Sequence, residues 1–447
     1  LIIPFAEVEQ LGAASLAQPT IDAALTAQTL NDIGLIIYTS GSTGKPKGAM
    51  LSWRNIRGVV PGIVERLQLR RDSSHLSYLP LCHVAEQMLT SFVPPYLGSQ
   101  VNFGESIRTV QEDLREVAPS IFLGVPRIWE KMHATLSIKR QEAAGLRGAL
   151  FDRALAACAP LADKARADWS LGERARFAWH YWLVFRALQN FCGLRRTQVA
   201  LTGAAPIPPD VVRFFRVIGV PLIEVYGLTE SSGMVTGHPL DHVVIGTVGT
   251  PTVGVEHRIG AQGELLLRGD MVFAGYYKNP EATAQSIQDG WLHTGDVVRE
   301  DSGQLKIVDR LKDIMITAGG KNLTPSEIEN TMKASPYIKE CIVVADARRF
   351  VSALVMIDFD TVAQWAQAQR IAFTHFRSLV ELPVVRALIE QEVARGNAKL
   401  AQVSQIRKFH LLTKELDHDD GEVTATMKVR RSSIYKTYAD DIEALYA

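Results

Sequence analysis

Residues 35–48 read LIIYTSGSTGKPKG, a short apolar run followed by hydroxyls, glycines and two lysines. The apolar run ends at Tyr38, which is the pattern of a buried strand that leads into a loop. Glycines let such a loop turn tightly and point backbone N–H groups inward, where hydroxyls and lysine charges add further donors. The stretch therefore predicts a strand followed by a loop that binds nucleotide phosphates.

The predicted phosphate-binding residues of this loop are Thr39, Ser40, Gly41, Ser42, Thr43, Gly44, Lys45 and Lys47. In a Walker A loop, Gly-Lys is followed by Ser or Thr, but here Lys45 is followed by Pro46. Proline has neither a hydroxyl nor an N–H group, so the pattern excludes a P-loop NTPase. A flexible Gly/Ser linker is the structural alternative, although a linker needs neither a preceding apolar strand nor spaced lysines.

Composition places the chain among ordinary globular proteins, with 447 residues, 47% hydrophobic and 21% charged. Lys plus Arg and Asp plus Glu balance at 48 each, so we expect no nucleic-acid partner. The four cysteines lie far apart without CxxC spacing, which indicates neither a zinc site nor a disulfide framework and favours a cytoplasmic location. No apolar run approaches the roughly 20 residues needed to span a bilayer.

The segments that follow the loop predict a layered α/β body. Ser52 is expected to cap a helix whose apolar positions recur at spacings of four and three residues: Ile56, Val60, Ile63 and Leu67. Strand, loop and helix thus follow one another. Short apolar runs at 121–123, 199–201 and 222–225 each end in turn residues before another helical stretch.

Residues 133–196 are predicted to form a helical insertion. From 139 to 196 the chain is rich in Ala, Leu and Arg, with eleven Lys or Arg against five Asp or Glu, a net charge of +6. Apolar side chains recur there at helical spacing: Phe177, Tyr181, Phe185 and Leu188. Two interpretations stay open: a helix that packs on its own domain, which we favour slightly, and a helix that gives the protein peripheral membrane contact.

A domain boundary is predicted between Leu311 and Lys312. Residues 246–309 carry glycine-punctuated apolar runs and are expected to be mainly β. The boundary divides the chain into a large domain, residues 1–311, and a small domain, residues 312–447.

The small domain is expected to be α+β. A helix is predicted at 325–333, with strands at 341–345 and 353–357. An amphipathic helix is predicted to begin at Pro383 and to stop at Gly396. Its shared apolar face consists of Val384, Val385, Leu388, Ile389 and Val393.

Two further motifs carry residue types suited to nucleotide chemistry. In Tyr226–Glu230, YGLTE, Thr229 and Glu230 offer hard oxygen ligands where a magnesium ion that bridges phosphates would lie, and Tyr226 is suited to stack on a base. In residues 291–296, WLHTGD, Asp296 is a candidate ligand of both ribose hydroxyls. A surface turn is the alternative interpretation of each motif taken singly.

In order and spacing these motifs resemble the adenylate-forming superfamily, which includes acyl-CoA synthetases, adenylation domains and luciferases. The resemblance rests on YTSGSTGKPKG at 38–48, GAAP at 203–206, YGLTE at 226–230, WLHTGD at 291–296 and VDRLKD at 308–313. Within the superfamily, the chain is similar to long-chain fatty acid CoA ligases, including the bubblegum type. That similarity rests on LSYLPLCHVAEQ at 76–87, FLGVPRIWEKM at 122–132 and the helical insertion.

The resemblance implies an α/β fold of the adenylate-forming type, with a large N-terminal domain of layered sheets and helices and a small, mobile α+β C-terminal domain. Because the chain starts at Leu1 with the loop close behind, we expect it to lack part of the N-terminal region. The implied reaction has two steps, from fatty acid and ATP to acyl-AMP and pyrophosphate, and then with CoA to the thioester and AMP. Mg²⁺ is the implied metal, on Thr229 and Glu230, and the oligomeric state is left open.

The resemblance also implies roles for single residues. Gly203, Ala204, Ala205, Tyr226 and Gly227 line the adenine site, and Asp296 and Arg310 hold the ribose. Four further roles are implied: His83 near the acyl carboxylate, Trp129 as a gate of the acyl tunnel, Lys312 as the hinge and Lys428 as the adenylation lysine. A structural histidine and a packed core tryptophan are the alternatives at 83 and 129. Around Lys428, Ala425 and Arg430 depart from the usual long-chain pattern.

Two other functions remain open from the sequence. The chain could pass its acyl group to a carrier protein instead of CoA. A non-catalytic homologue that binds a membrane or a partner through the basic, aromatic insertion is the second alternative. The presence of Lys45, Glu230, Asp296 and Lys428 argues against the second.

Overall fold

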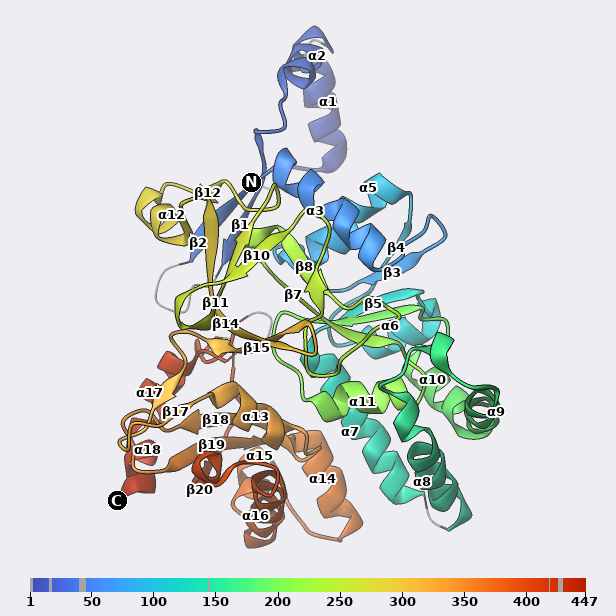
Figure 1. Ribbon diagram of the computed structural model, residues 1–447, viewed down its shortest axis with the longest axis vertical. Helices are drawn as coiled ribbons and strands as arrows, with labels where there is room; N and C mark the ends of the chain where they lie inside the picture. Colours follow the sequence, from blue (N-terminus) through green and yellow to red (C-terminus); the bar gives the residue numbers. More distant parts are fainter. Residues whose placement is uncertain (1–2, 16–17, 40–45, 144, 418, 425–428) are drawn as a thin grey trace.

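The computed structural model describes residues 3–15, 18–39, 46–143, 145–417, 419–424 and 429–447 (Figure 1). A seven-stranded sheet in the order β4-β3-β5-β6-β7-β8-β9 runs through its centre. The first five of these strands are parallel, and β8 and β9 are antiparallel to their neighbours. The strands are β3 (Ser74–Ser77), β4 (Gln100–Phe103), β5 (Ile121–Gly124), β6 (Val199–Thr202), β7 (Leu222–Leu228), β8 (Gly233–Gly237) and β9 (Thr250–Pro251).

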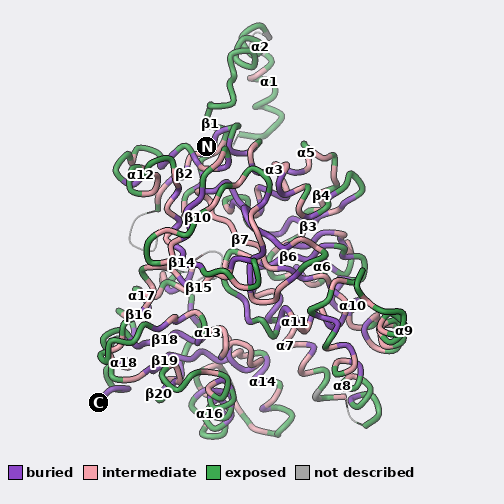
Figure 2. Tube along the Cα trace, in the orientation of Figure 1, coloured by how far each residue is buried: buried purple, intermediate pink, exposed green. Residues whose placement is uncertain are grey.

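Burial of the central strands explains why their sequences are continuously apolar. Every residue of β5 and β6 is buried, as expected where helices cover both faces of a parallel sheet. Figure 2 shows this buried band crossing the middle of the N-terminal part. The contacting helices are α3 (Trp53–Arg66) on β8, α6 (Val110–Val117) on β3, α7 (Pro126–Glu142) on β5 and α11 (Pro209–Val217) on β7. The apolar runs at 121–123, 199–201 and 222–225 all lie in these strands.

The helix predicted after Ser52 is confirmed. The Ser52 hydroxyl accepts a hydrogen bond from the backbone N–H of Asn55, and the Asn55 side chain accepts one from the backbone N–H of Ser52. This reciprocal pair satisfies two of the free N–H groups at the helix start. All four predicted face residues are buried: Ile56, Val60, Ile63 and Leu67.

The strand-loop-helix order expected around the phosphate loop is wrong. A second strand, β2 (Lys47–Ser52), follows the loop and pairs antiparallel with β1 (Ile33–Thr39). Strand β12 (Gly275–Tyr276) joins the other side of β2 to complete a three-stranded sheet. Successive side chains of β1 point to opposite faces of this sheet, so Ile37 is buried while Ile36 and Tyr38 are exposed. The short apolar run is therefore only half buried.

An antiparallel sheet makes up most of the segment predicted to be β-rich. Its order is β10-β11-β14-β13, and β15 pairs with β14. Asp296 on β14 is the register partner of Arg310 on β15. The strands are β10 (Glu256–Ile259), β11 (Glu264–Arg268), β13 (Ile287–Gln288), β14 (Trp291–Asp301) and β15 (Gln304–Arg310).

The insertion is helical, as predicted, although its first helix, α7, begins earlier, at Pro126. Next come α8 (Leu146–Cys158), α9 (Leu171–His180), a π-helical turn at Tyr181–Phe185 and α10 (Arg186–Cys192). Phe185 is fully buried, and three neighbours pack against the same core: Phe177, Tyr181 and Leu188. For this face the packed interpretation is confirmed, so a membrane contact of the insertion would have to use other side chains.

The C-terminal part has its own three-stranded sheet, β18-β19-β20, with α13 (Pro325–Lys333) and α16 (Pro383–Asn397) packed against it and each other. The strands are β18 (Ile338–Val344), β19 (Val351–Ile357) and β20 (Ile406–Leu411). Helix α13 matches its predicted bounds. Two details of α16 differ from expectation: Val384 is exposed, and the helix passes through Gly396, which lies against Met332 of α13.

The hydrophobic cores of the two parts separate between Leu305 and Met315. The N-terminal core includes residues from Ile37 to Leu305, and the C-terminal cores begin at Met315. Among the described residues, no helix combines the length and apolar character needed to cross a membrane.

Candidate active site

Asp296, in the middle of β14, is the centre of a buried polar group where β14 pairs with the end of β15. The Tyr226 hydroxyl donates a hydrogen bond of 2.6 Å to Oδ2 of Asp296, and Nε of Arg310 lies 2.7 Å from Oδ1. Burial, followed by the charge of Asp296, raises the pKa of Tyr226 well above its usual range, so the phenol stays protonated and donates. The structure thus brings together three residues predicted separately: Tyr226, Asp296 and Arg310.

Glu230 lies beside this group on the turn that follows β7. Its Oε1 accepts a hydrogen bond of 2.6 Å from the Tyr276 hydroxyl, and its backbone carbonyl accepts one of 2.9 Å from the N–H of Phe273. Burial, and then the charge of Glu230, raise the pKa of Tyr276. Thr229 begins the same turn, and its backbone carbonyl accepts from the N–H of Ser232 at 3.0 Å.

Tyr276 was missed by the sequence reasoning. It belongs to β12, whose two residues pair with β2, and no motif or periodicity marks so short a strand. The pairing places the Tyr276 ring under Lys47, whose Nζ lies 5.1 Å from the ring centroid. Lys47 therefore lies over the ring of the same tyrosine whose hydroxyl binds Glu230.

Lys312 completes the positive side of the site. Burial is the main cause that lowers its pKa, and the charges of Arg310 and Lys47 add to that effect. Three cations thus lie close enough to influence one another beside two carboxylates, Asp296 and Glu230. This is the electrostatic arrangement that a polyphosphate ligand with a ribose requires.

Part of the predicted phosphate loop lies outside the described residues: Ser40, Gly41, Ser42, Thr43, Gly44 and Lys45. The two ends of this loop meet, because Thr39 is the register partner of Lys47 and its hydroxyl lies 3.4 Å from the Lys47 carbonyl oxygen. Lys428 also lies outside the described residues. The described residues on either side of it, Val423 and Val429, form an isolated antiparallel β-bridge.

Beside the polar group lies a small, largely apolar cavity of about 50 Å³ that is partly open to solvent. Tyr226 lines this cavity and is therefore the wall shared by the cavity and the Asp296 group. Three residues predicted for the adenine site also line it: Gly203, Ala204 and Gly227. Ala205 is half-buried in the same loop. The apolar lining comes from several elements and includes Leu67, Leu79, Met88, Leu123, Leu201 and Met234.

His83 lies at the cavity and caps the short helix α4 (Val84–Gln87). Its Nδ1 accepts a hydrogen bond of 3.1 Å from the backbone N–H of Ala85. Burial lowers the pKa of His83, so the ring is neutral near pH 7 and carries its proton on Nε2. The histidine thus combines a structural role with one N–H left for a ligand. The preceding residue, Cys82, is exposed, whereas the other three cysteines are buried.

Trp129 is packed inside the domain. It is fully buried, contacts Phe122 and Phe215 edge-on, and does not belong to the cavity lining. Its indole N–H lies 3.0 Å from the Gly124 carbonyl and 3.1 Å from the Leu201 carbonyl. The ring therefore joins the ends of β5 and β6, next to residues that do line the cavity. This placement matches the core alternative for Trp129.

The oxygen ligands available for magnesium are few. Among the residues that the structure describes, no group of three or more His, Cys, Asp or Glu could hold a metal ion. Mg²⁺ commonly binds through one or two carboxylates, with water and substrate phosphates completing its octahedron. Glu230 with the neighbouring Thr229 fits that mode, and a metal site made only of protein ligands does not.

Comparison with known proteins agrees with this geometry. Residues 4–277 match the family described as AMP-binding enzyme, and residues 312–447 match the AMP-binding enzyme C-terminal domain. The chain is 38% identical over 431 residues to the putative fatty-acid–CoA ligase fadD11 of Mycobacterium tuberculosis, covering 93% of this chain and 74% of that protein. It is 31% identical over 463 residues to the long-chain-fatty-acid–CoA ligase ACSBG2 of Rattus norvegicus, covering 96% and 69%.

A solved structure shows the same fold. The adenylation domain of a carboxylate reductase from Mycobacterium chelonae superposes with a TM-score of 0.67 at 24% identity, covering 94% of this chain and 61% of that one. The two family matches account for most of the chain. They include Tyr226, Glu230 and Tyr276, but not Asp296 and Arg310, which lie on β14 and β15. The adenylate-forming fold expected from the motifs is therefore confirmed, and the chain belongs to the AMP-binding enzyme family.

Proposed function

We propose that this chain is an ATP-dependent long-chain fatty acid CoA ligase. The observation that carries the proposal is the shared wall at Tyr226, which joins this apolar cavity to a charged nucleotide-type site. A cavity lined by aliphatic side chains suits an acyl chain. A charged site beside it suits the nucleotide that reacts with the carboxyl end of that chain. The names of the relatives, fatty-acid–CoA ligases, support the same substrate class.

Two displacements make up the proposed reaction. In the first, a fatty acid carboxylate oxygen forms a bond to the α-phosphorus of ATP, and the bond to pyrophosphate breaks. In the second, the CoA sulfur forms a bond to the acyl carbon, the bond to AMP breaks, and the thiol proton leaves to solvent. Both steps move negative charge onto oxygen atoms, so fixed cations and donors supply most of the stabilisation.

The described residues divide this work by position. Asp296 accepts hydrogen bonds from the ribose hydroxyls. Arg310 and Tyr226 hold its carboxylate in position for this. Lys47 faces the phosphates from the start of β2. His83 donates a hydrogen bond from its Nε2–H to the carboxylate of the fatty acid. Gly203 and Ala204 let the adenine ring approach the backbone closely.

Thr229 and Glu230 would hold Mg²⁺ at the phosphates. The bound ion would neutralise phosphate charge during adenylation. The Tyr276 hydroxyl keeps Glu230 in place through its 2.6 Å hydrogen bond. Residues 40–45 and Lys428, which lie outside the described residues, are proposed to contact phosphate oxygens. CoA is the second co-substrate, and we propose a cytoplasmic location on the basis of the free cysteines.

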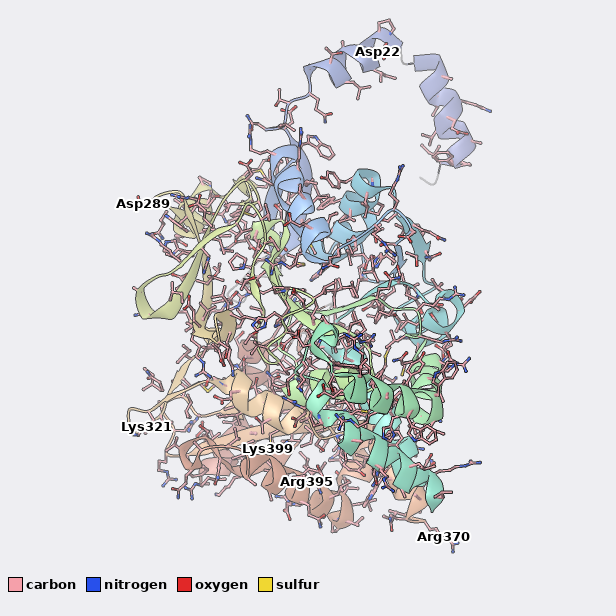
Figure 3. The ribbon with its side chains drawn as sticks, turned by 45° about the vertical axis from the view of Figure 1, so that its right-hand side comes forward. Asp22, Asp289, Lys321, Arg370, Arg395 and Lys399 are labelled. Carbon is pink, nitrogen blue, oxygen red and sulfur yellow. The ribbon has the colours of Figure 1, made fainter. Side chains whose placement is uncertain are left out.

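A matched pair of aspartates tests the proposal. Fatty-acid-dependent exchange of pyrophosphate into ATP reports the first step, and acyl-CoA formation reports both. Asp296→Asn should lower kcat/KM for ATP by about 10² because the ribose loses an ionised acceptor. Asp289→Asn alters an exposed residue at the outer edge of the same sheet (Figure 3). It should change neither pyrophosphate exchange nor acyl-CoA formation. A chain that makes no acyl-AMP with any fatty acid would overturn the proposed function.

Transfer of the acyl group to a carrier protein is the alternative outcome. It predicts normal pyrophosphate exchange, no acyl-CoA and acylation of a phosphopantetheinyl carrier. A non-catalytic homologue would give neither product, so one set of assays separates all three functions.

A further inference from the structure

Helix α9 and the π-helical turn after it are apolar on two opposite faces. The inner face, which includes Phe177 and Phe185, packs against the N-terminal core, with these two ring centroids 5.9 Å apart. The outer face carries large apolar side chains with high exposed fractions: Leu171 at 86%, Trp179 at 66%, Trp182 at 65% and Leu183 at 51%. Single exposed apolar residues are ordinary, but a contiguous group with two tryptophans on one helix is not.

Spacing along the helix places these side chains on one side. Leu171, Trp179 and Trp182 are separated by eight and three residues, and the exposed small residues Ala175 and Ala178 lie between them. Such positions fall within one helical stripe. Figure 1 shows α9 at the right-hand edge of the N-terminal part, beside α10, and Figure 2 colours most of its residues as exposed. No described element covers the stripe.

The charges around the stripe are positive. The guanidinium of Arg186 lies 4.6 Å from the centroid of the Trp182 ring. Arg174 and Arg176 are exposed on the same helix. Among the described residues, these three arginines form no ion pair with a carboxylate. The acidic residue of the helix, Glu173, is paired with Lys164 at 2.7 Å, so the excess positive charge remains.

We propose that this surface, formed by Leu171, Trp179, Trp182, Leu183, Arg174, Arg176 and Arg186, binds an anionic phospholipid bilayer. Tryptophan is suited to the boundary between headgroups and acyl chains because its ring is large and apolar while its N–H is polar. Arg186 lies beside the Trp182 ring, and Arg174 keeps its full charge while it donates hydrogen bonds to the backbone carbonyls of Trp169 and Ala167. Positive side chains of this kind add favourable free energy near an anionic surface. The proposal does not depend on ligase activity, because binding is measured without substrates.

A second copy of the chain fits this surface less well. In a two-fold symmetric dimer the same patch meets itself, so the arginines of one copy would face those of the other. Like charges brought together in an interface are unfavourable. A bilayer with negative headgroups has no such conflict, and it explains why the apolar and positive side chains occur together.

Vesicle co-sedimentation with the full chain tests the proposal. We expect binding to phosphatidylcholine vesicles that contain phosphatidylglycerol, and weaker binding to pure phosphatidylcholine. The double variant Trp179→Ser, Trp182→Ser should reduce affinity for the anionic vesicles by about tenfold or more, and Arg176→Glu should reduce it severalfold. Matched controls are Phe103→Ser and Arg299→Glu, which alter exposed residues of β4 and β14 and should bind as the unaltered chain does.

Tryptophan fluorescence gives a second measurement. Brominated lipids should quench the unaltered chain more strongly than the Trp179→Ser, Trp182→Ser variant, and equal thermal melting would show that both are folded. Equal sedimentation of the double variant and the unaltered chain would overturn the proposal. So would a loss of self-association in the variant without any vesicle binding, which would assign the surface to a second copy instead.

Discussion

The guanidinium of Arg127 on α7 donates a hydrogen bond of 2.7 Å to the carboxylate of Asp358, which lies 231 positions later in the C-terminal part. Glu130, one turn along α7, lies 3.9 Å from the ammonium of Lys333, also in the C-terminal part. These groups are mostly buried. A charged contact of this kind holds the two parts in one relative orientation, and a rotation about the proposed hinge at Lys312 would have to break it.

A double-mutant cycle measures this contact. Asp358→Asn removes the charge but keeps the side-chain oxygen that caps α14 (Phe359–Ala368) through the N–H of Thr361. We expect Arg127→Gln and Asp358→Asn each to lower the free energy of unfolding, with a coupling of about 1–3 kcal/mol in the double variant. Denaturant unfolding provides the values. Strictly additive effects would show that the pair contributes nothing to holding the two parts together.

His83 should have separable structural and ligand-binding roles. His83→Asn keeps an oxygen that can accept the N–H of Ala85, but it removes the imidazole Nε2 proton at the cavity. We expect this variant to retain its melting temperature and to raise KM for fatty acid by about tenfold. His83→Ala should lose stability as well. Unchanged fatty acid kinetics in His83→Asn would leave the cap as the only role of this histidine.

Trp129 should act mainly through packing. Trp129→Phe leaves the carbonyls of Gly124 and Leu201 without their indole donor and should lower the free energy of unfolding by about 1–3 kcal/mol. Trp129→Ala adds a cavity and should cost about 3–5 kcal/mol. The gate hypothesis predicts something different: altered chain-length preference and KM for fatty acid at full stability. Parallel melting curves and chain-length profiles distinguish the two.

His133 should make stability depend on pH. Burial lowers the pKa of His133, whose ring contacts Phe214 edge-on, to about 4, whereas an unfolded histidine titrates near 6.5. Between these values the unfolded state binds a proton that the folded state does not. The free energy of unfolding should therefore fall by up to ~1.4 kcal/mol per pH unit as pH decreases from about 6.5 to 4. His133→Gln should show a shallower decrease over that window, and an identical slope would contradict the assignment.

Lys428 and Lys312 should affect opposite half-reactions. Lys428→Ala removes one cation used against the α-phosphate, so acyl-AMP formation should slow by about 10² or more. Thioester formation from supplied acyl-AMP should be largely retained. Lys312→Pro stiffens the proposed hinge and should slow the second step while sparing adenylation. Equal losses of both steps in Lys428→Ala, with the fold intact by circular dichroism, would point to Lys45 or Lys47 instead.

Local signals in the sequence predicted the elements that depend on neighbouring residues. The cap at Ser52 and the face of α3 depend on spacings of three and four residues, so they were predictable. The bounds of α13 followed from Pro325 in the same way. Motif residues such as Tyr226 and Asp296 were identified by type, but only the pairing of β14 with β15 brings Asp296 to Arg310.

Long-range pairing and opposite helix faces limited the remaining predictions. Tyr276 reaches Glu230 because a two-residue strand joins β2, and two residues are too few to show a pattern. The contact between Arg127 and Asp358 depends on how two separate cores meet. In α9 and the π-helical turn after it, the periodicity of Phe177, Tyr181 and Phe185 correctly indicated the face that packs against the core. It gave no sign that Trp179 and Trp182 form a second apolar stripe on the exposed face.

The exposed thiol of Cys82 gives the unaltered chain a built-in labelling position. The other three cysteines are buried, and burial raises the pKa of each of them, which suppresses their reaction with maleimides. A fluorophore attached under mild conditions would therefore sit beside His83 at the mouth of the apolar cavity. Its emission would follow the arrival and departure of an acyl chain in real time, with no engineered cysteine.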